Sequence, residues 1–288
     1  MTPRAPTLGA YGAGVMTLLL WAGAFLAIRA GVRHTEPAAL AAARFLFAGL
    51  VSVGWILFGA RERPKWRDVP RIAVCGLLGI AIYNGLLGAG EQGVGAGLAS
   101  FVISTQAVFA ALGAWWLEGA RLHRRLLLGG VVAASGIAIM GAAGEGGGST
   151  AGILLILAAA ACSGFFFVLQ RPLIARLGPM TSAAAVMAAG GLWLLPWAPA
   201  GITAMAADRT ARTAILYLAL GSSVCGYAFW MVALDRLGAT RAALLLYLMA
   251  PLTALLEIAI GEAEFALPTL AGAILALVGI GVAARPHR

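Results

Sequence analysis

The chain has 288 residues, of which 61% are hydrophobic and 11% charged, and its mean hydropathy is +0.94. Soluble domains are about half apolar and about a quarter charged, so this composition excludes a water-soluble globular protein and a disordered chain. The net charge of +9 comes from short basic clusters between apolar runs, which argues against nucleic-acid binding. The three cysteines form no close pair and the three histidines lie far apart in sequence, so we expect no metal, no cofactor and no enzyme activity.

Ten apolar stretches are long enough to cross a bilayer, which takes about 20 residues. Their length and lack of alternation predict helices and exclude a membrane barrel, whose strands alternate polar and apolar residues. A signal peptide is the alternative for the first stretch, but that stretch continues without a polar cleavage region. Cut at charge clusters and at Gly and Pro, the expected spans are 10–30, 37–58, 69–89, 94–116, 126–143, 153–170, 181–199, 214–234, 239–260 and 267–284.

The basic residues indicate how these spans are oriented. With a cytoplasmic N-terminus, 15 of the 20 Lys and Arg residues fall in cytoplasmic segments and 4 fall outside, while Arg44 lies within a span. Positive residues concentrate on the cytoplasmic side of membrane proteins. The sequence therefore predicts an all-α, multi-pass membrane protein with both termini in the cytoplasm.

The two halves of the chain resemble each other. The segment from Tyr83 to Glu118 parallels the segment from Tyr227 to Glu262 at an offset of 144 residues, and a glycine-rich stretch at 144–149 joins the halves. Five helices per half is an odd number, so the halves must insert with opposite orientation. We therefore expect two inverted five-helix repeats, 1–145 and 146–288, around a central cavity, a construction associated with alternating-access transporters.

Several motifs resemble those of a known family. They are WAGAF at 21–25, EPAALAAARF at 36–45, the proline at 251 followed by Gly-Glu at 261–262, and the closing GIG at 279–281. Over nearly the whole chain, as two repeats, these resemble EamA-type members of the drug/metabolite transporter superfamily, and most of all the aromatic amino-acid exporters of the YddG type. The resemblance implies a basket of ten helices in the bacterial inner membrane that exports amino acids and related metabolites.

In inverted-repeat carriers the solute binds near the midplane, between corresponding helices of the two halves. The candidate substrate-binding residues are the aromatic, hydroxyl and amide side chains of those helices. They are Trp21, Tyr83, Asn84, Ser104, Gln106, Ser163, Gln170, Tyr227, Trp230 and Tyr247. Each residue taken singly is more often a core or lipid-facing residue, and the prediction rests on the set. Because all are neutral, we expect an uncharged cavity that prefers neutral and aromatic amino acids over acidic or basic ones.

Arg44 is the one basic residue well inside an expected span, and the acidic Glu257 lies near the outer end of another. Arg44 and Glu257 are candidates for a gate or polar network, with outward snorkelling to the surface as the alternative, slightly favoured for Glu257. The GxGxxG pattern at 88–93 lacks the preceding strand of a dinucleotide site, so we interpret it as a tight turn between helices. No acidic residue is then expected in the central part of a span, which favours facilitated diffusion or exchange.

The expected partners are a small-molecule substrate and the lipid bilayer. The oligomeric state stays open, with a monomer as one option. The alternative function is export of another amphipathic metabolite, a drug or a nucleoside. A membrane enzyme would need clustered His, Asp or Cys at membrane depth, and the sequence offers none.

Overall fold

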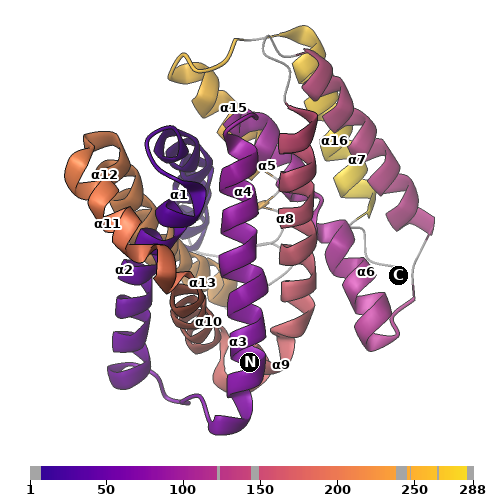
Figure 1. The fold of residues 1–288 in the computed structure, drawn as a ribbon. Helices are drawn as coiled ribbons and strands as arrows, with labels where there is room; N and C mark the ends of the chain where they lie inside the picture. The colour runs from indigo at the N-terminus through magenta and orange to yellow at the C-terminus, as the bar shows by residue number, and fades with distance from the viewer. Residues whose placement is uncertain are drawn as a thin grey trace.

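The computed structural model describes residues 8–121, 124–143, 149–237, 245–246, 248–264 and 266–283, and these form helices and short connections (Figure 1). In the first half they are α1 (Leu8–Val32), α2 (Pro37–Phe58), α3 (Val69–Gly76), α4 (Tyr83–Glu91), α5 (Ala96–Ser104), α6 (Gln106–Glu118) and α7 (Arg124–Ala143). In the second half they are α8 (Thr150–Leu169), α9 (Arg171–Leu177), α10 (Pro179–Leu194), α11 (Ala198–Ala207), α12 (Arg209–Leu216), α13 (Gly226–Leu237), α15 (Met249–Ala259) and α16 (Leu267–Ala283).

Short turns of other helix types join some of these elements into longer ones. Two are 3-10 turns, η1 (Trp66–Asp68) before α3 and η3 (Leu195–Trp197) between α10 and α11. Two are π-helical, η2 (Leu77–Ile82) between α3 and α4 and η4 (Tyr217–Cys225) between α12 and α13. A π-helical turn holds an extra residue and often marks a functional site.

Seven continuous helical stretches are long and apolar enough to cross a membrane. They are Gly9–Val32, Pro37–Phe58, Trp66–Glu91, Ala96–Glu118, Thr150–Leu169, Pro179–Ala207 and Arg209–Ala233. The other three expected spans overlap shorter apolar helices, Leu128–Ala142, Met249–Ala259 and Leu267–Gly279. Residues 239–244 and 247 of the expected span 239–260 lie outside the described part of the chain. The chain is therefore a helical, multi-pass membrane protein, and the count of ten spans stays a prediction.

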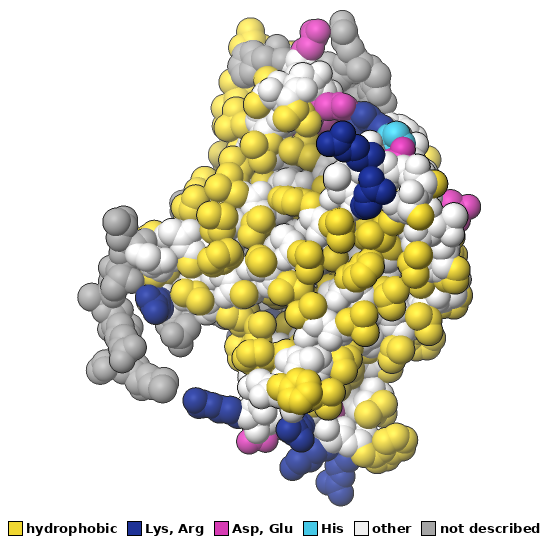
Figure 2. All heavy atoms as spheres, turned by 90° about the vertical axis from the view of Figure 1, so that its left-hand side faces the viewer, with side chains coloured by type: hydrophobic (Ala, Val, Ile, Leu, Met, Phe, Trp, Pro, Cys, Tyr) yellow, Lys and Arg dark blue, Asp and Glu magenta, His cyan; other side chains and the backbone are white. Residues whose placement is uncertain are grey.

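The surface agrees with a bilayer environment. Figure 2 shows a broad band of hydrophobic side chains between two ends where charged side chains gather. Large apolar residues such as Leu50, Val131 and Leu192 are more than half exposed. In water such a surface would be an aggregation hazard, whereas in lipid it is the natural outer face.

Small residues set the closest helix contacts. Helices α7 and α16 lie side by side (Figure 1), and a Cβ added to Gly136 would come within 2.4 Å of the backbone nitrogen of Ala276 and the carbonyl oxygen of Gly272. Glycine is thus needed for this close approach, as in other membrane helix pairs.

One expected span is divided and one expected turn is wrong. The expected span 94–116 corresponds to the continuous stretch Ala96–Glu118, which is divided at Thr105 into α5 and α6, where the hydroxyl of Thr105 donates to the carbonyl oxygen of Val102 (2.7 Å). The expected turn at 88–93 is helical as far as Glu91, so α4 carries this carboxylate into the protein.

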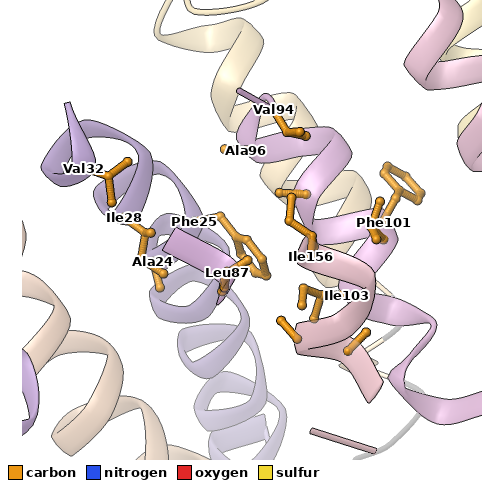
Figure 3. Packing of buried hydrophobic residues seen from close by; sticks show 14 of the residues in the cluster. Ala24, Phe25, Ile28, Val32, Leu87, Val94, Ala96, Phe101, Ile103 and Ile156 are labelled. Carbon is orange, nitrogen blue, oxygen red and sulfur yellow. The ribbon is translucent and has the colours of Figure 1, made fainter. Parts of the chain in front are cut away.

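A hydrophobic core lies where α1, α4, α5 and α8 meet. Figure 3 shows Phe25, Leu87, Ile103 and Ile156 from these four helices pointing toward one another. All four are at least nine-tenths buried. This packing holds the four helices together beside the polar groups described next.

Candidate functional site

The first polar group of the interior is centred on Arg44 of α2. Its Nε donates to the hydroxyl of Ser223 (3.0 Å), its Nη1 to Oδ1 of Asn84 (3.1 Å) and its Nη2 to the hydroxyl of Ser222 (3.2 Å). The side chain therefore points inward, toward α4 and η4, and not to the surface as in the snorkelling alternative.

All three of these partners are neutral. None of the ion pairs found among the described residues includes Arg44. A guanidinium has five N–H donors and the network uses three, so two remain. A partly buried cation without a carboxylate partner is costly in a membrane protein and marks functional sites. The interior polar site thus carries a positive charge, which corrects the expectation of an uncharged cavity.

A small pocket adjoins this guanidinium. Arg44 and Asn84 supply its polar groups, and the rest of its lining is apolar apart from Gly88, with residues from α1, α2 and η4 such as Ile28, Pro37 and Leu218. Its volume is only about 10 Å³, room for a single water molecule, so a solute would reach Arg44 only after the surrounding helices move apart.

The π-helical segments place the partners of Arg44. Ser222 and Ser223 lie in η4, and Asn84 follows η2 by two residues. The hydroxyl of Ser222 also donates to the carbonyl oxygen of Leu218 (3.1 Å). The side-chain amide nitrogen of Asn84 donates to the carbonyl oxygen of Ile80 (2.8 Å). Ser222 was not among the residues predicted from the sequence, although two adjacent serines in an apolar helix were a usable signal.

The second group is aromatic. The indole ring of Trp21 lies 5.4 Å from the ring of Tyr227 and 5.6 Å from that of Trp230, measured between centroids. Its Nε1 donates to the carbonyl oxygen of Ser222 (3.0 Å). A Cβ on Gly226 would lie 2.6 Å from that nitrogen, so glycine at 226 makes room for the indole.

The other candidate residues lie elsewhere. The hydroxyl of Ser163 donates to Oε1 of Gln106 (2.7 Å), which links α8 to α6, while the hydroxyl of Ser104 donates within its own helix to Ser100. Tyr83 is partly buried against the hydrophobic core, and Gln170 is partly buried beside the first turn of α9. Tyr247 falls outside the described residues. The structure thus brings Arg44 to Asn84, Trp21 to Tyr227 and Trp230, and Gln106 to Ser163.

Glu257 of α15 belongs to a separate polar group. Its two carboxylate oxygens accept hydrogen bonds from the backbone N–H groups of Ala96 (2.8 Å) and Gly97 (2.7 Å), and Arg29 Nη1 lies 3.8 Å away. Glu257 is only 5% exposed, so the expectation of surface snorkelling is wrong. The physical reason is the N-terminus of α5, whose free N–H groups and positive dipole end favour a carboxylate.

Glu91 lies near this group and is 1% exposed. Neither of its carboxylate oxygens has a hydrogen-bond partner among the residues that the structure describes. The GxGxxG pattern had placed Glu91 in a turn, whereas α4 continues through this residue and ends there, with the carboxylate buried.

Comparison with known proteins gives a consistent picture. The model of the EamA-like transporter family matches residues 8–142 and 150–285. A probable terminal-alkyne amino-acid exporter of Streptantibioticus cattleyicolor is 35% identical over 263 residues, which are 90% of this chain and 88% of that protein. An uncharacterised transporter of Archaeoglobus fulgidus is 29% identical over 273 residues, 94% and 96% of the two chains. One solved crystal structure shares the fold, with a TM-score of 0.64 at 20% identity and 97% of both chains covered.

Proposed function

Because this chain belongs to the EamA-like transporter family, we propose that it exports amino acids and related carboxylate-bearing metabolites across the bacterial inner membrane by alternating access. In this proposal the two halves, 1–145 and 146–288, are inverted repeats and both termini are cytoplasmic. The 35% identical relative, a probable exporter of one kind of amino acid, supports this class of solute.

The observation that carries the proposal is the guanidinium of Arg44. It is held by three neutral groups and keeps two N–H donors for another partner. A carboxylate on the solute supplies the missing negative charge and fits an arginine with two parallel hydrogen bonds. The same charge disfavours a solute that carries only a cation at this end.

The aromatic group supports the choice of side chain. Trp21, Tyr227 and Trp230 pack together next to Ser222, which also bonds to Arg44. Aromatic faces cover apolar and aromatic groups well. We therefore propose neutral and aromatic amino acids as preferred solutes, as in the YddG type of exporter. A different amphipathic solute, such as a nucleoside or a drug, is the alternative.

Transport by the purified protein in liposomes tests the proposal. Liposomes are loaded with labelled phenylalanine, and unlabelled phenylalanine, phenethylamine (which lacks the carboxylate) or uridine is added outside. We expect phenylalanine to exchange and the other two not to compete. Arg44→Gln should lower the apparent affinity roughly ten- to a hundred-fold, because the lost charged hydrogen bonds contribute about 1–3 kcal/mol.

The matched control is Arg67→Gln, the same substitution at an exposed residue. It should exchange phenylalanine like the wild type. Equal competition by phenethylamine together with normal exchange by Arg44→Gln would contradict the proposal. Competition by uridine alone would favour the alternative.

A further inference from the structure

Glu91 is a buried carboxyl group in an unfavourable place for a negative charge. It is the last residue of α4, so it lies at the end of the helix where unpaired carbonyl groups make the dipole negative. It is 1% exposed, and no group of the described chain donates a hydrogen bond to either oxygen. Burial without hydrogen bonds costs much more free energy for the carboxylate than for the neutral acid.

The nearby carboxylate of Glu257 has favourable surroundings for a negative charge, in contrast to Glu91. Both of its oxygens accept backbone hydrogen bonds at the start of α5, where the helix dipole is positive. The glycines at 95 and 97 permit this contact, because a Cβ on either would lie 2.8 to 3.0 Å from a Glu257 oxygen. The groups around Glu257 therefore compensate a negative charge on its oxygens, and no such hydrogen bonds reach Glu91 from the described residues.

Arg29 of α1 is the cation shared by these two acids. Its Nη1 is 3.8 Å from Glu257 Oε1, which is an ion pair without a hydrogen bond. Its Nε and Nη1 are buried and have no hydrogen-bond partner within the described part of the chain. Arg29 thus has donors to spare for a second carboxylate, and Glu91 has two oxygens without donors.

Few charged side chains act on Glu91. The groups that act on it electrostatically are Arg29 from α1, Glu257 from α15 and Arg44 from α2. On its own helix Tyr83 is the other titratable group, and the described residues of α5 and α8, which also pack nearby, carry no Asp, Glu, Lys, Arg or His. The balance between one neighbouring cation and one neighbouring anion therefore decides the charge of Glu91.

We propose that Glu91 is a proton-binding site that couples solute movement to proton movement. When the carboxyl group holds its proton, Arg29 stays with Glu257. When the proton leaves to water, the Glu91 carboxylate attracts the unused N–H groups of Arg29, and its negative charge is compensated. This inference rests on the proposed transport function and identifies its source of energy.

Movement of the Arg29 side chain changes the contact between α1 and α15, because Arg29 forms one of the ion pairs between them. Directly after the end of α1, Arg33 pairs with Glu262, which follows the end of α15, through contacts of 3.0 and 2.6 Å. The Arg29–Glu257 pair and the Arg33–Glu262 pair together hold α1 against α15 and the residues that follow it. Loss of the first pair on deprotonation weakens that contact, so the protonation state and the helix arrangement change together.

The test uses the purified full-length protein in liposomes, with phenylalanine as the solute. Exchange without any gradient measures transport itself. Accumulation driven by an imposed pH gradient, with the membrane potential held at zero, measures coupling. We expect the wild type to show both, Glu91→Gln to lose pH-driven accumulation, and Glu62→Gln, the same substitution at an exposed residue, to keep both.

A second measurement does not depend on transport. Infrared spectroscopy of the wild type at neutral pH should show the carbonyl band of a protonated buried carboxyl group. The band should be absent from Glu91→Gln and present in Glu62→Gln. If the wild type exchanges solute but shows neither pH-driven accumulation nor this band, the inference is wrong and the transport function stands. Accumulation driven by a sodium gradient at constant pH would also overturn it. If no solute exchanges at all, the transport function is what fails, and the band alone then decides whether Glu91 binds a proton.

Discussion

The indole Nε1 of Trp21 donates a hydrogen bond to the backbone carbonyl oxygen of Ser222, 3.0 Å away. The hydroxyl of the same serine accepts a hydrogen bond from Arg44 (3.2 Å). One residue of the π-helical segment η4 therefore joins the aromatic group on α1 and α13 to the guanidinium on α2. A substitution in either group is therefore expected to shift the side chains of the other.

Removing the hydroxyls of Ser222 and Ser223 should loosen Arg44. The double Ser→Ala variant deletes two of the three side-chain bonds that hold the guanidinium. Each is worth about 0.5–1.5 kcal/mol, so the KM for phenylalanine in liposomes should rise roughly ten-fold. Ser135→Ala is the matched control, because the hydroxyl of Ser135 is exposed and donates only within its own helix. An unchanged KM in the double variant would argue against a positioning role for these serines.

Trp230→Ala should weaken transport of aromatic solutes. It removes the indole that lies 5.6 Å from Trp21 and is expected to cost about 0.5–1.5 kcal/mol of aromatic contact, or a few-fold to ten-fold in KM. The loss should be larger for phenylalanine than for alanine. Trp197→Ala, at a residue that is 43% exposed, should leave both values unchanged. Equal losses for both solutes would mean that the ring supports the fold and does not contact the solute.

Gly136→Ala should destabilise the protein. The added methyl group would meet the backbone of Ala276 and Gly272 at 2.4 Å, and backbone atoms cannot move aside cheaply. Overpacking of this kind costs about 1–3 kcal/mol, so the melting temperature in detergent should fall. Gly12→Ala is the control, because nothing lies within 4 Å of its added Cβ. Equal melting temperatures for the two variants would show that α7 and α16 can separate without cost.

Reporter fusions test the orientation of the halves. Fusions after Gly146 and Asp208 should report the outside of the cytoplasmic membrane, and fusions after Arg176 and Arg236 the inside, because most basic residues fall in the segments expected to be cytoplasmic. A cytoplasmic signal at Gly146 would mean an even number of spans in the first half. Inverted repeats would then be excluded.

Hydropathy and family motifs were enough to predict a helical membrane protein and a transporter family. They located the apolar stretches because a span must hide its backbone from lipid over its whole length. They did not predict that Glu91 and Glu257 are buried, because burial depends on which helices meet. Glu257 is stabilised by the N-terminus of α5, 160 residues away in sequence, and no local pattern reports such a contact. The break at Thr105 was not predicted either, because the residues on both sides of it are equally apolar.

The π-helical winding of η4 has a consequence for motion. A π turn stores one residue more than an α turn, and one residue corresponds to about 100° of rotation around a helix axis. Rewinding η4 as an α-helix would therefore twist α13 against α12 by about that angle and lengthen the helix by about 1.5 Å, the rise of one residue. Trp230 would turn away from Trp21, and Ser222 and Ser223 would turn away from Arg44 with the same segment. One rewinding would therefore disrupt the aromatic group and the support of the guanidinium together.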